Sequence, residues 1–244
     1  MAYRVLKKIW RWSTQLCGGI FWYVRDVYRY RHLTSTQRSP QKLLLFPQLW
    51  DKASAAHTFD KHYVYMDRWA FKHIQQRLPK EHVDVGSSIR FLSMATTVVP
   101  VTFVDIRPIA LDFNNFTCKP GSILELPFAD NSLDSLSCLH VAEHIGLGRY
   151  GDPLDAEGTK KACKELQRVL APGGRLYFAL PVGQSVTYFN AHRVHNPGAI
   201  LEYFDQLRLE EFAGVDDAGH FHSAMQPADL AESRYACGCF VFTK

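Results

Sequence analysis

The chain has 244 residues, of which 47% are hydrophobic, 13% aromatic and 21% charged. These proportions indicate a globular protein with one sizeable core, and they exclude a disordered, collagen-like or low-complexity chain. The longest apolar run, residues 16–24, is too short to cross a bilayer. The six cysteines show neither CxxC pairs nor a framework spacing, which argues against a disulfide scaffold or a zinc ribbon and favours a reducing compartment.

Positive charge is concentrated at the N-terminal end. Residues 1–42 carry a net charge of +8, so residues 43–244 carry −4. Residues 1–33 mix aromatic and basic side chains at helical spacing, and residues 34–42 have the composition of a linker. Such a segment fits an anionic membrane surface, and equally a cover for the main domain or for a second subunit.

The N-terminal sequence and the charge pattern also bear on whether nucleic acid is a partner and on the cellular location. The acidic main part and the lack of a recognised RNA-binding module make nucleic acid an unexpected partner. No signal-peptide pattern follows the first basic residues. We therefore expect a cytoplasmic protein whose residues 1–33 are a candidate for contact with the inner membrane face.

The elements after the linker change character along the chain. Residues 46–78 show helical periodicity that Pro79 ends, and short apolar runs then alternate with amphipathic stretches. This alternation predicts an α/β fold with a doubly wound, mostly parallel sheet in three layers. The strand candidates are residues 82–85, 101–106, 122–124, 133–139 and 175–180, with the best helix at 155–170 and a final antiparallel pair at 207–212 and 235–242.

We divide the chain at two positions on this basis. Residues 1–42 are the basic helical extension and linker, residues 43–80 a helical lead-in, and residues 81–244 the main domain.

The first chemical motif is EHVDVGSS at residues 81–88, where an apolar strand reaches Asp84 and is followed by Gly86 and Ser87. In an open parallel sheet, ligands bind where strands end and helices begin, and a glycine lets the backbone approach them. The next strand ends at Asp105, whose carboxylate can accept hydrogen bonds from both hydroxyls of a ribose. The pair of motifs predicts a nucleoside ligand.

Two later segments continue the series: SILELPFADNSLDSLSCLHVAEHIG and KELQRVLAPGGRLYFALPVG. In this order the motifs resemble the class I S-adenosylmethionine-dependent methyltransferases, over residues 81 to about 183 and again in the final strands. The resemblance implies a Rossmann-like fold and methyl transfer from S-adenosylmethionine. HVDVGSS, VDIRP and YFNAHRVHNP look like a less characterised branch associated with sugar and polysaccharide biosynthesis, which implies a small-molecule or glycan-type acceptor methylated on oxygen.

The resemblance also assigns residues to the cofactor, from its methionine end to its adenine. They are Asp84, Gly86, Ser87, Asp105, Ile106, Leu124 and Glu125. Two departures from the family pattern stand out: only Gly86 remains of the usual GxGxG loop, and Ser122 stands where an acidic residue often contacts the adenine. They leave open a catalytically silent module of the same fold that docks on a membrane or partner.

The segment HVAEH places His140, Glu143 and His144 just after a buried strand, where they would meet the acceptor. Any of the three can take the proton of an acceptor hydroxyl. HxxEH is also the pattern of inverted zinc metalloproteases, but those carry it inside a long helix. A third reading is that the histidines cap and pack the turn. We predict no metal ligands here.

A second polar group follows the fifth strand and would border the same crevice. Asn190, His192 and Arg193 are therefore candidates for binding the acceptor, with Arg193 suited to a phosphate or carboxylate. The alternative is an ordered loop whose side chains satisfy backbone groups.

Overall fold

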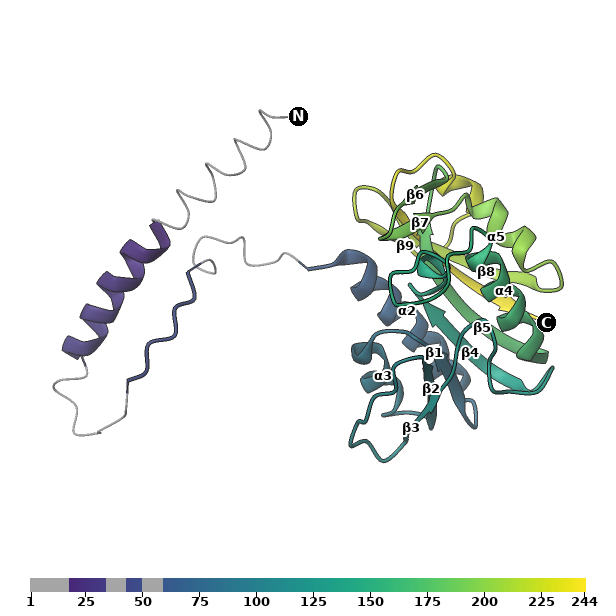
Figure 1. Ribbon diagram of the computed structural model, residues 1–244, viewed down its shortest axis with the longest axis horizontal. Helices are drawn as coiled ribbons and strands as arrows, with labels where there is room; N and C mark the ends of the chain where they lie inside the picture. The colour runs from purple at the N-terminus through teal and green to yellow at the C-terminus, as the bar shows by residue number, and fades with distance from the viewer. Residues whose placement is uncertain (1–17, 34–42, 50–58) are drawn as a thin grey trace. The chain divides into compact units, whose positions relative to one another are not determined.

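The computed structural model describes residues 18–33, 43–49 and 59–244, in two compact units, Met1–Phe59 and Asp60–Lys244 (Figure 1). In the first unit, residues 18–33 are helical and leave apolar side chains such as Phe21 and Val24 exposed. The remaining parts of the predicted extension, residues 1–17 and 34–42, lie outside the described residues. Among the described helices, none has the length and hydropathy needed to span a membrane.

The helix predicted from residue 46 begins later in the structure. Residues 43–49 have no regular secondary structure, so the prediction is wrong at its start. Pro47 disfavours helical dihedrals at Phe46, the residue before it. The helix α2 spans Lys61–Arg77 and belongs to the second unit. Its N-cap Asp60 accepts a hydrogen bond from the Tyr63 N–H at 3.3 Å.

An eight-stranded sheet forms the centre of the second unit, in the order β3-β2-β1-β4-β5-β10-β8-β9. Strands β1 to β5 are parallel, and β10 lies between β5 and β8, antiparallel to both. This confirms the mostly parallel sheet with a final antiparallel strand. The strands are β1 (His82–Val85), β2 (Val101–Asp105), β3 (Phe116–Pro120), β4 (Leu133–Leu139), β5 (Leu170–Val182), β8 (Arg208–Val215), β9 (Phe221–His222) and β10 (Ala236–Thr243).

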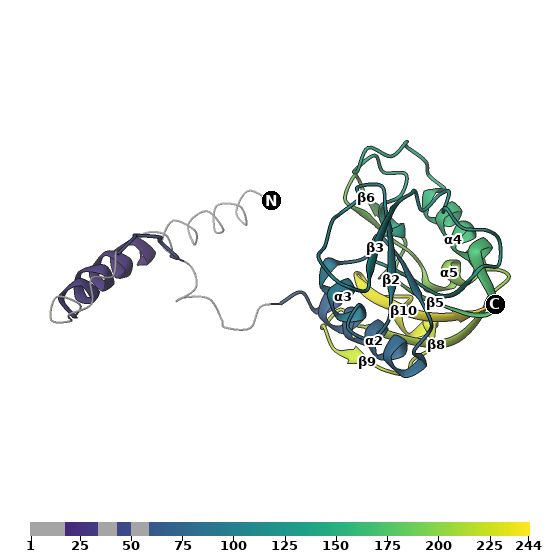
Figure 2. The same cartoon turned by 90° about the horizontal axis from the view of Figure 1, so that it is seen from below.

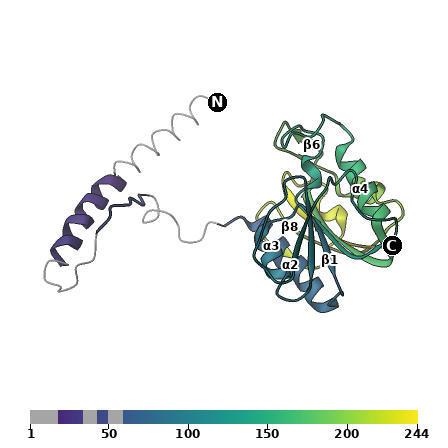
Figure 3. The same ribbon diagram turned by 60° about the horizontal axis from the view of Figure 1, so that its bottom comes forward.

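Helices cover both faces of this sheet and make three layers (Figure 2). On one face, α2 and α3 (Ile89–Ala95) bury side chains such as Trp69 and Phe91. On the other, α4 (Gly158–Val169) and α5 (Pro197–Tyr203) bury Leu166 and Ile200. A separate hairpin of β6 (Val186–Tyr188) and β7 (His192–Val194) lies at one end of the unit (Figure 3).

One predicted strand is wrong. Residues 122–124 form a turn, closed by the hydrogen bond from the Glu125 N–H to the Ser122 carbonyl at 3.0 Å. The strand in this region is β3, just before the turn, at the edge of the sheet. Most of its side chains are exposed or half-buried, so it lacks the apolar run that marks the central strands.

Candidate functional site

An open cavity of about 120 Å³ lies where the carboxyl ends of β1, β2 and β4 meet. The strand order reverses between β1 and β4, and this is the position at which open α/β sheets bind their ligands. Of the predicted site residues, those that line the cavity are Gly86, Asp105, Ile106, Leu124, His140 and His144.

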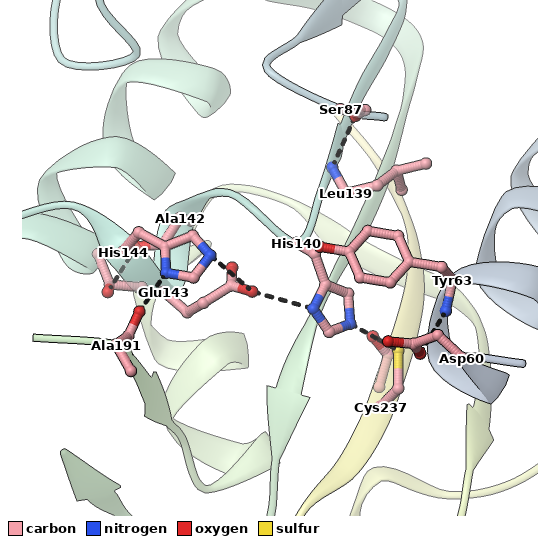
Figure 4. Close-up of polar contacts among 12 residues, drawn as sticks. Asp60, Tyr63, Ser87, Leu139, His140, Ala142, Glu143, His144, Ala191 and Cys237 are labelled. Carbon is pink, nitrogen blue, oxygen red and sulfur yellow. Dashed lines mark hydrogen bonds and ion pairs between the residues drawn. The ribbon is translucent and has the colours of Figure 1, made fainter. Parts of the chain in front are cut away.

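The first predicted loop is held by buried polar contacts. Asp84 Oδ1 accepts a hydrogen bond from the Ser87 N–H at 3.0 Å, and the Ser137 hydroxyl donates to Asp84 Oδ2. Ser87 Oγ in turn accepts from the Leu139 N–H at 3.0 Å (Figure 4). The side chains of Asp84 and Ser87 therefore bond to the protein and tie the end of β1 to the end of β4. Burial raises the pKa of Asp84 to about 7, even though hydrogen bonds from Ser137 and Ser87 lower it.

The contact network continues behind Asp84 to a histidine that the sequence analysis did not single out. His82 Nε2 and Nδ1 lie 2.8 Å from the hydroxyls of Ser137 and Ser135, respectively. Because Ser137 gives its hydrogen to Asp84, it accepts from His82 Nε2, so Nδ1 is the acceptor for Ser135. Burial lowers the pKa of His82 to about 3, which keeps this ring neutral. The alternation of Ser135 and Ser137 on β4 was the only sequence signal for this network.

Gly86 turns the chain at the edge of the cavity. Its φ is +71°, and a Cβ added there would lie 3.0 Å from Val141 Cγ1. Both the dihedral and the close approach of Val141 favour glycine. This is the physical reason for a glycine at this position of the loop.

Asp105 is the last residue of β2, and its side chain is 17% exposed. Its Oδ1 accepts from the Arg107 N–H at 2.7 Å, which fixes the carboxylate at the cavity wall. Tyr150 and Asp152 also line the cavity. The Arg107 guanidinium lies 4.6 Å from the centre of the Tyr150 ring, so these two lining side chains make a cation–π contact.

The turn after β3 supplies the wall where the resemblance places adenine. Leu124 lines the cavity together with Ser122, whereas Glu125 is not part of the lining. Ser122 Oγ accepts from the Leu124 N–H at 3.1 Å, so part of its accepting capacity serves its own turn.

His140, Glu143 and His144 come together after β4 (Figure 4). Glu143 is 1% exposed, and its Oε1 lies 3.0 Å from His140 Nδ1 and 3.8 Å from His144 Nε2. His144 Nδ1 lies 2.6 Å from the Ala191 carbonyl oxygen. A carbonyl only accepts, so Nδ1 carries the hydrogen and Nε2 is the basic nitrogen of the neutral His144 ring.

The electrostatics of this cluster favour a charged pair in its interior. Burial on its own would lower the pKa of His140, but the neighbouring Cys237 and Glu143 outweigh burial and raise it well above its ordinary value. Burial would likewise raise the pKa of Glu143, yet His140 lowers it below its ordinary value. Both shifts favour an imidazolium beside a carboxylate over two neutral groups.

The geometry differs from that of an HxxEH zinc helix. His140 has φ +56° and directly follows β4, and only Ala142–His144 are helical, as the short 3-10 helix η2. The two histidines lie near the same oxygen of Glu143 instead of leaving that carboxylate free beside a metal. Over the described residues, these three side chains do not form a candidate metal cluster.

The predicted acceptor loop divides into exposed and structural residues. Asn190 is exposed, and His192 is half-buried, with its ring centre 5.1 Å from that of Tyr235. Arg193 is buried, and its guanidinium donates to the carbonyl oxygens of Ile145 and Asp155 at 2.5 and 2.9 Å. Arg193 thus holds the segment after η2 in place, and it does not line the cavity.

Comparisons with known proteins bear on this fold and cavity. A family model described as "Caenorhabditis protein of unknown function, DUF268" matches residues 104–206. No curated protein sequence matches the chain. Among solved structures, the chain is similar to the (4+2)-cyclase SpnF, at 14% identity over 73% of this chain and 81% of that chain, with a TM-score of 0.54.

Two methyltransferases are similar to the same degree. Coclaurine N-methyltransferase bound to N-methylheliamine and SAH is 11% identical over 78% of this chain and 73% of that chain, with a TM-score of 0.54. Geranyl diphosphate methyltransferase in complex with GPP and sinefungin is 10% identical over 74% of this chain and 78% of that chain, with a TM-score of 0.53. Since a cyclase stands beside the methyltransferases, the likeness establishes a fold and leaves the reaction to the site. The unit from Asp60 to Lys244 has the Rossmann-like fold that these methyltransferases adopt.

Proposed function

We propose that this protein binds S-adenosylmethionine in the cavity at the ends of β1, β2 and β4 and transfers its methyl group to an acceptor hydroxyl. The observation that carries the proposal is the position of Asp105: a carboxylate anchored at the tip of β2, facing a cavity at the reversal of strand order. In this arrangement the carboxylate of Asp105 accepts hydrogen bonds from the ribose hydroxyls. The turn at Ser122 and Leu124 borders the adenine.

The proposed acceptor lies beside the histidines at the other end of the cavity. Methyl transfer from a sulfonium is an in-line displacement, for which alignment of the two reacting atoms supplies most of the rate gain. His144 Nε2 then accepts the hydroxyl proton, and the nearby carboxylate of Glu143 stabilises the imidazolium that forms. The acceptor is a small molecule or a glycan, with the exposed Asn190 and the half-buried His192 as its binding residues.

Calorimetric titration with S-adenosylmethionine and S-adenosylhomocysteine tests the cofactor half of the proposal. We expect micromolar binding by the wild-type chain and a loss of at least about tenfold in Asp105→Ala, because a bound hydroxyl pair loses a charged acceptor. Asp112→Ala changes an exposed carboxylate outside the cavity and is the matched control. If folded wild-type protein binds neither compound, the enzyme proposal fails in favour of a silent docking module.

His144→Asn tests the catalytic half. Asparagine can still donate to the Ala191 carbonyl but has no basic nitrogen. We expect cofactor binding to persist while methyl transfer to a hydroxyl acceptor, screened among sugars and lipid-linked glycans, falls by about a hundredfold or more. Equal transfer rates in the variant and the wild type would remove His144 from the mechanism.

A further inference from the structure

A cluster of nitrogen and sulfur ligands lies beside the proposed acceptor site and is not used by it. His62 is the second residue of α2, His140 directly follows β4, and Cys237 is the second residue of β10. The fold thus gathers three side chains of types that can ligate a metal from distant parts of the chain. His140 and Cys237 are buried, and His62 is partly buried.

The distances suit a tetrahedral ion. His140 Nε2 lies 3.3 Å from Cys237 Sγ, and ligand atoms of all three side chains lie within 4.8 Å of one another. In a tetrahedral zinc site, metal–ligand bonds of about 2.0–2.3 Å place neighbouring ligand atoms about 3.3–3.6 Å apart. The His140–Cys237 pair already has this separation. His62, at the partly exposed start of α2, needs only a small movement to complete the set.

The groups around the cluster orient its ligands as they are oriented in metal sites. Glu143 Oε1 lies 3.0 Å from His140 Nδ1, so the other ring nitrogen, Nε2, faces Cys237. A buried carboxylate on the far nitrogen of a histidine is the usual support for a zinc-bound imidazole. The His62 ring stacks on Tyr235, with ring centres 4.9 Å apart.

The backbone at His140 is a further sign of a constrained site. His140 has φ +56°, a left-handed conformation that costs a non-glycine residue energy. Such conformations persist where the surroundings fix them, and they cluster at functional sites. Here the conformation directs the ring between Glu143 and Cys237.

We propose that His62, His140 and Cys237 bind one Zn²⁺ ion, with Glu143 as the positioning residue for His140. Two imidazoles and a thiolate are the donor set of a borderline-soft divalent ion. When it binds, the ion displaces the Nε2 proton of His140 and the thiol proton of Cys237 to solvent. Three protein ligands leave a fourth position for water or an acceptor group. The ion joins the start of α2 to the sheet and fixes His140 at the cavity wall. This inference is independent of the methyl-transfer proposal, since metal binding is measured without S-adenosylmethionine.

Co²⁺ and Zn²⁺ titrations of the full-length, chelator-treated protein test the site. We expect one Co²⁺ per chain with an intense near-ultraviolet band from thiolate-to-cobalt charge transfer, displaced by Zn²⁺. Cys237→Ser should abolish the band. His62→Ala, at a partly exposed position, should fold normally and weaken Zn²⁺ binding at least about tenfold, because even outer-shell changes cost that much.

Cys163→Ser is the matched control, since Cys163 is buried in α4 on the opposite face of the sheet. It should keep the cobalt band and the Zn²⁺ affinity of the wild type. Absence of a thiolate–cobalt band in folded wild-type protein would overturn the proposal. So would a band that survives in Cys237→Ser, or Zn²⁺ affinity unchanged in His62→Ala.

Discussion

Replacing Asp84 by asparagine should change how the stability of the fold depends on pH. Burial raises the pKa of Asp84 from 3.8 to about 7, so between these values the folded protein holds one proton more than the unfolded chain. The contribution of Asp84 to stability is therefore greatest at low pH and is lost as the pH rises to about 7. Each pH unit in this window costs about 1.4 kcal/mol of the free energy of unfolding, or about 2 kcal/mol from about pH 5 to about pH 6.5.

The assay is urea unfolding of the wild type and of Asp84→Asn at several pH values in this range. The wild type must be compared with the variant at each pH, because the wild-type curve alone mixes several groups. Buried histidines such as His82 and His195 have lowered pKa values, so their contribution to stability rises with pH while that of Asp84 falls. The wild type should lose about 2 kcal/mol relative to the variant as the pH rises over this range, whatever the constant cost of the substitution. Asp134→Asn, at an exposed position of β4, should run parallel to the wild type. Parallel curves for Asp84→Asn as well would refute the reasoning from burial.

Two further predictions concern the loop after β1 and the N-terminal helix. Gly86→Ala should lower the free energy of unfolding by about 1–2 kcal/mol because its backbone is left-handed, and by a further amount because the added Cβ would contact Val141. Gly151→Ala measures the backbone part alone, because φ there is +87° and an added Cβ meets nothing within 4 Å. Equal losses for the two variants in urea unfolding would contradict the contribution of the Val141 contact. In the helix of residues 18–33, the double substitution Arg25→Gln and Arg29→Gln in the full-length protein should weaken binding to anionic vesicles about 30-fold in co-sedimentation, because each removed charge contributes about 1 kcal/mol. Unchanged pelleting would argue for a protein partner of this helix instead.

The fold was predictable to the extent that burial leaves a pattern in the sequence. β1 and β4 have the predicted bounds because nearly all of their residues are buried and apolar residues recur along both strands. The edge strand β3 escaped because its side chains are mostly exposed. The start of α2 was set by a local feature, the N-cap at Asp60, which the periodicity alone did not register.

The site was predictable where a residue's role follows from its place at a strand end. Gly86 and Asp105 line the cavity because each follows or ends a parallel strand. Roles that depend on distant partners were out of reach. The guanidinium of Arg193 faces carbonyl oxygens 38 and 48 residues away, and the imidazole of His140 faces the thiol of Cys237, 97 residues away. No local pattern encodes such pairs, so the sequence predicted Arg193 as an acceptor-binding residue and His140 as a base.

The thinned glycine loop is compatible with a bound cofactor for a reason that lies in Ser87. The side chain of Ser87 is buried, accepts a hydrogen bond from the Leu139 N–H and takes no part in lining the cavity. The second glycine of GxGxG falls at Ser88, whose hydroxyl accepts from the Phe91 N–H and donates to Asp67, and which takes no part in lining the cavity either. Neither serine therefore adds bulk on the ligand side. The Ser87 contact ties the loop to β4, and a loop ordered before binding loses less entropy when a ligand arrives. If the cofactor nevertheless binds weakly, we expect the cause at Ser122, whose hydroxyl stands at the proposed adenine wall where the resembling family often has a charged acceptor.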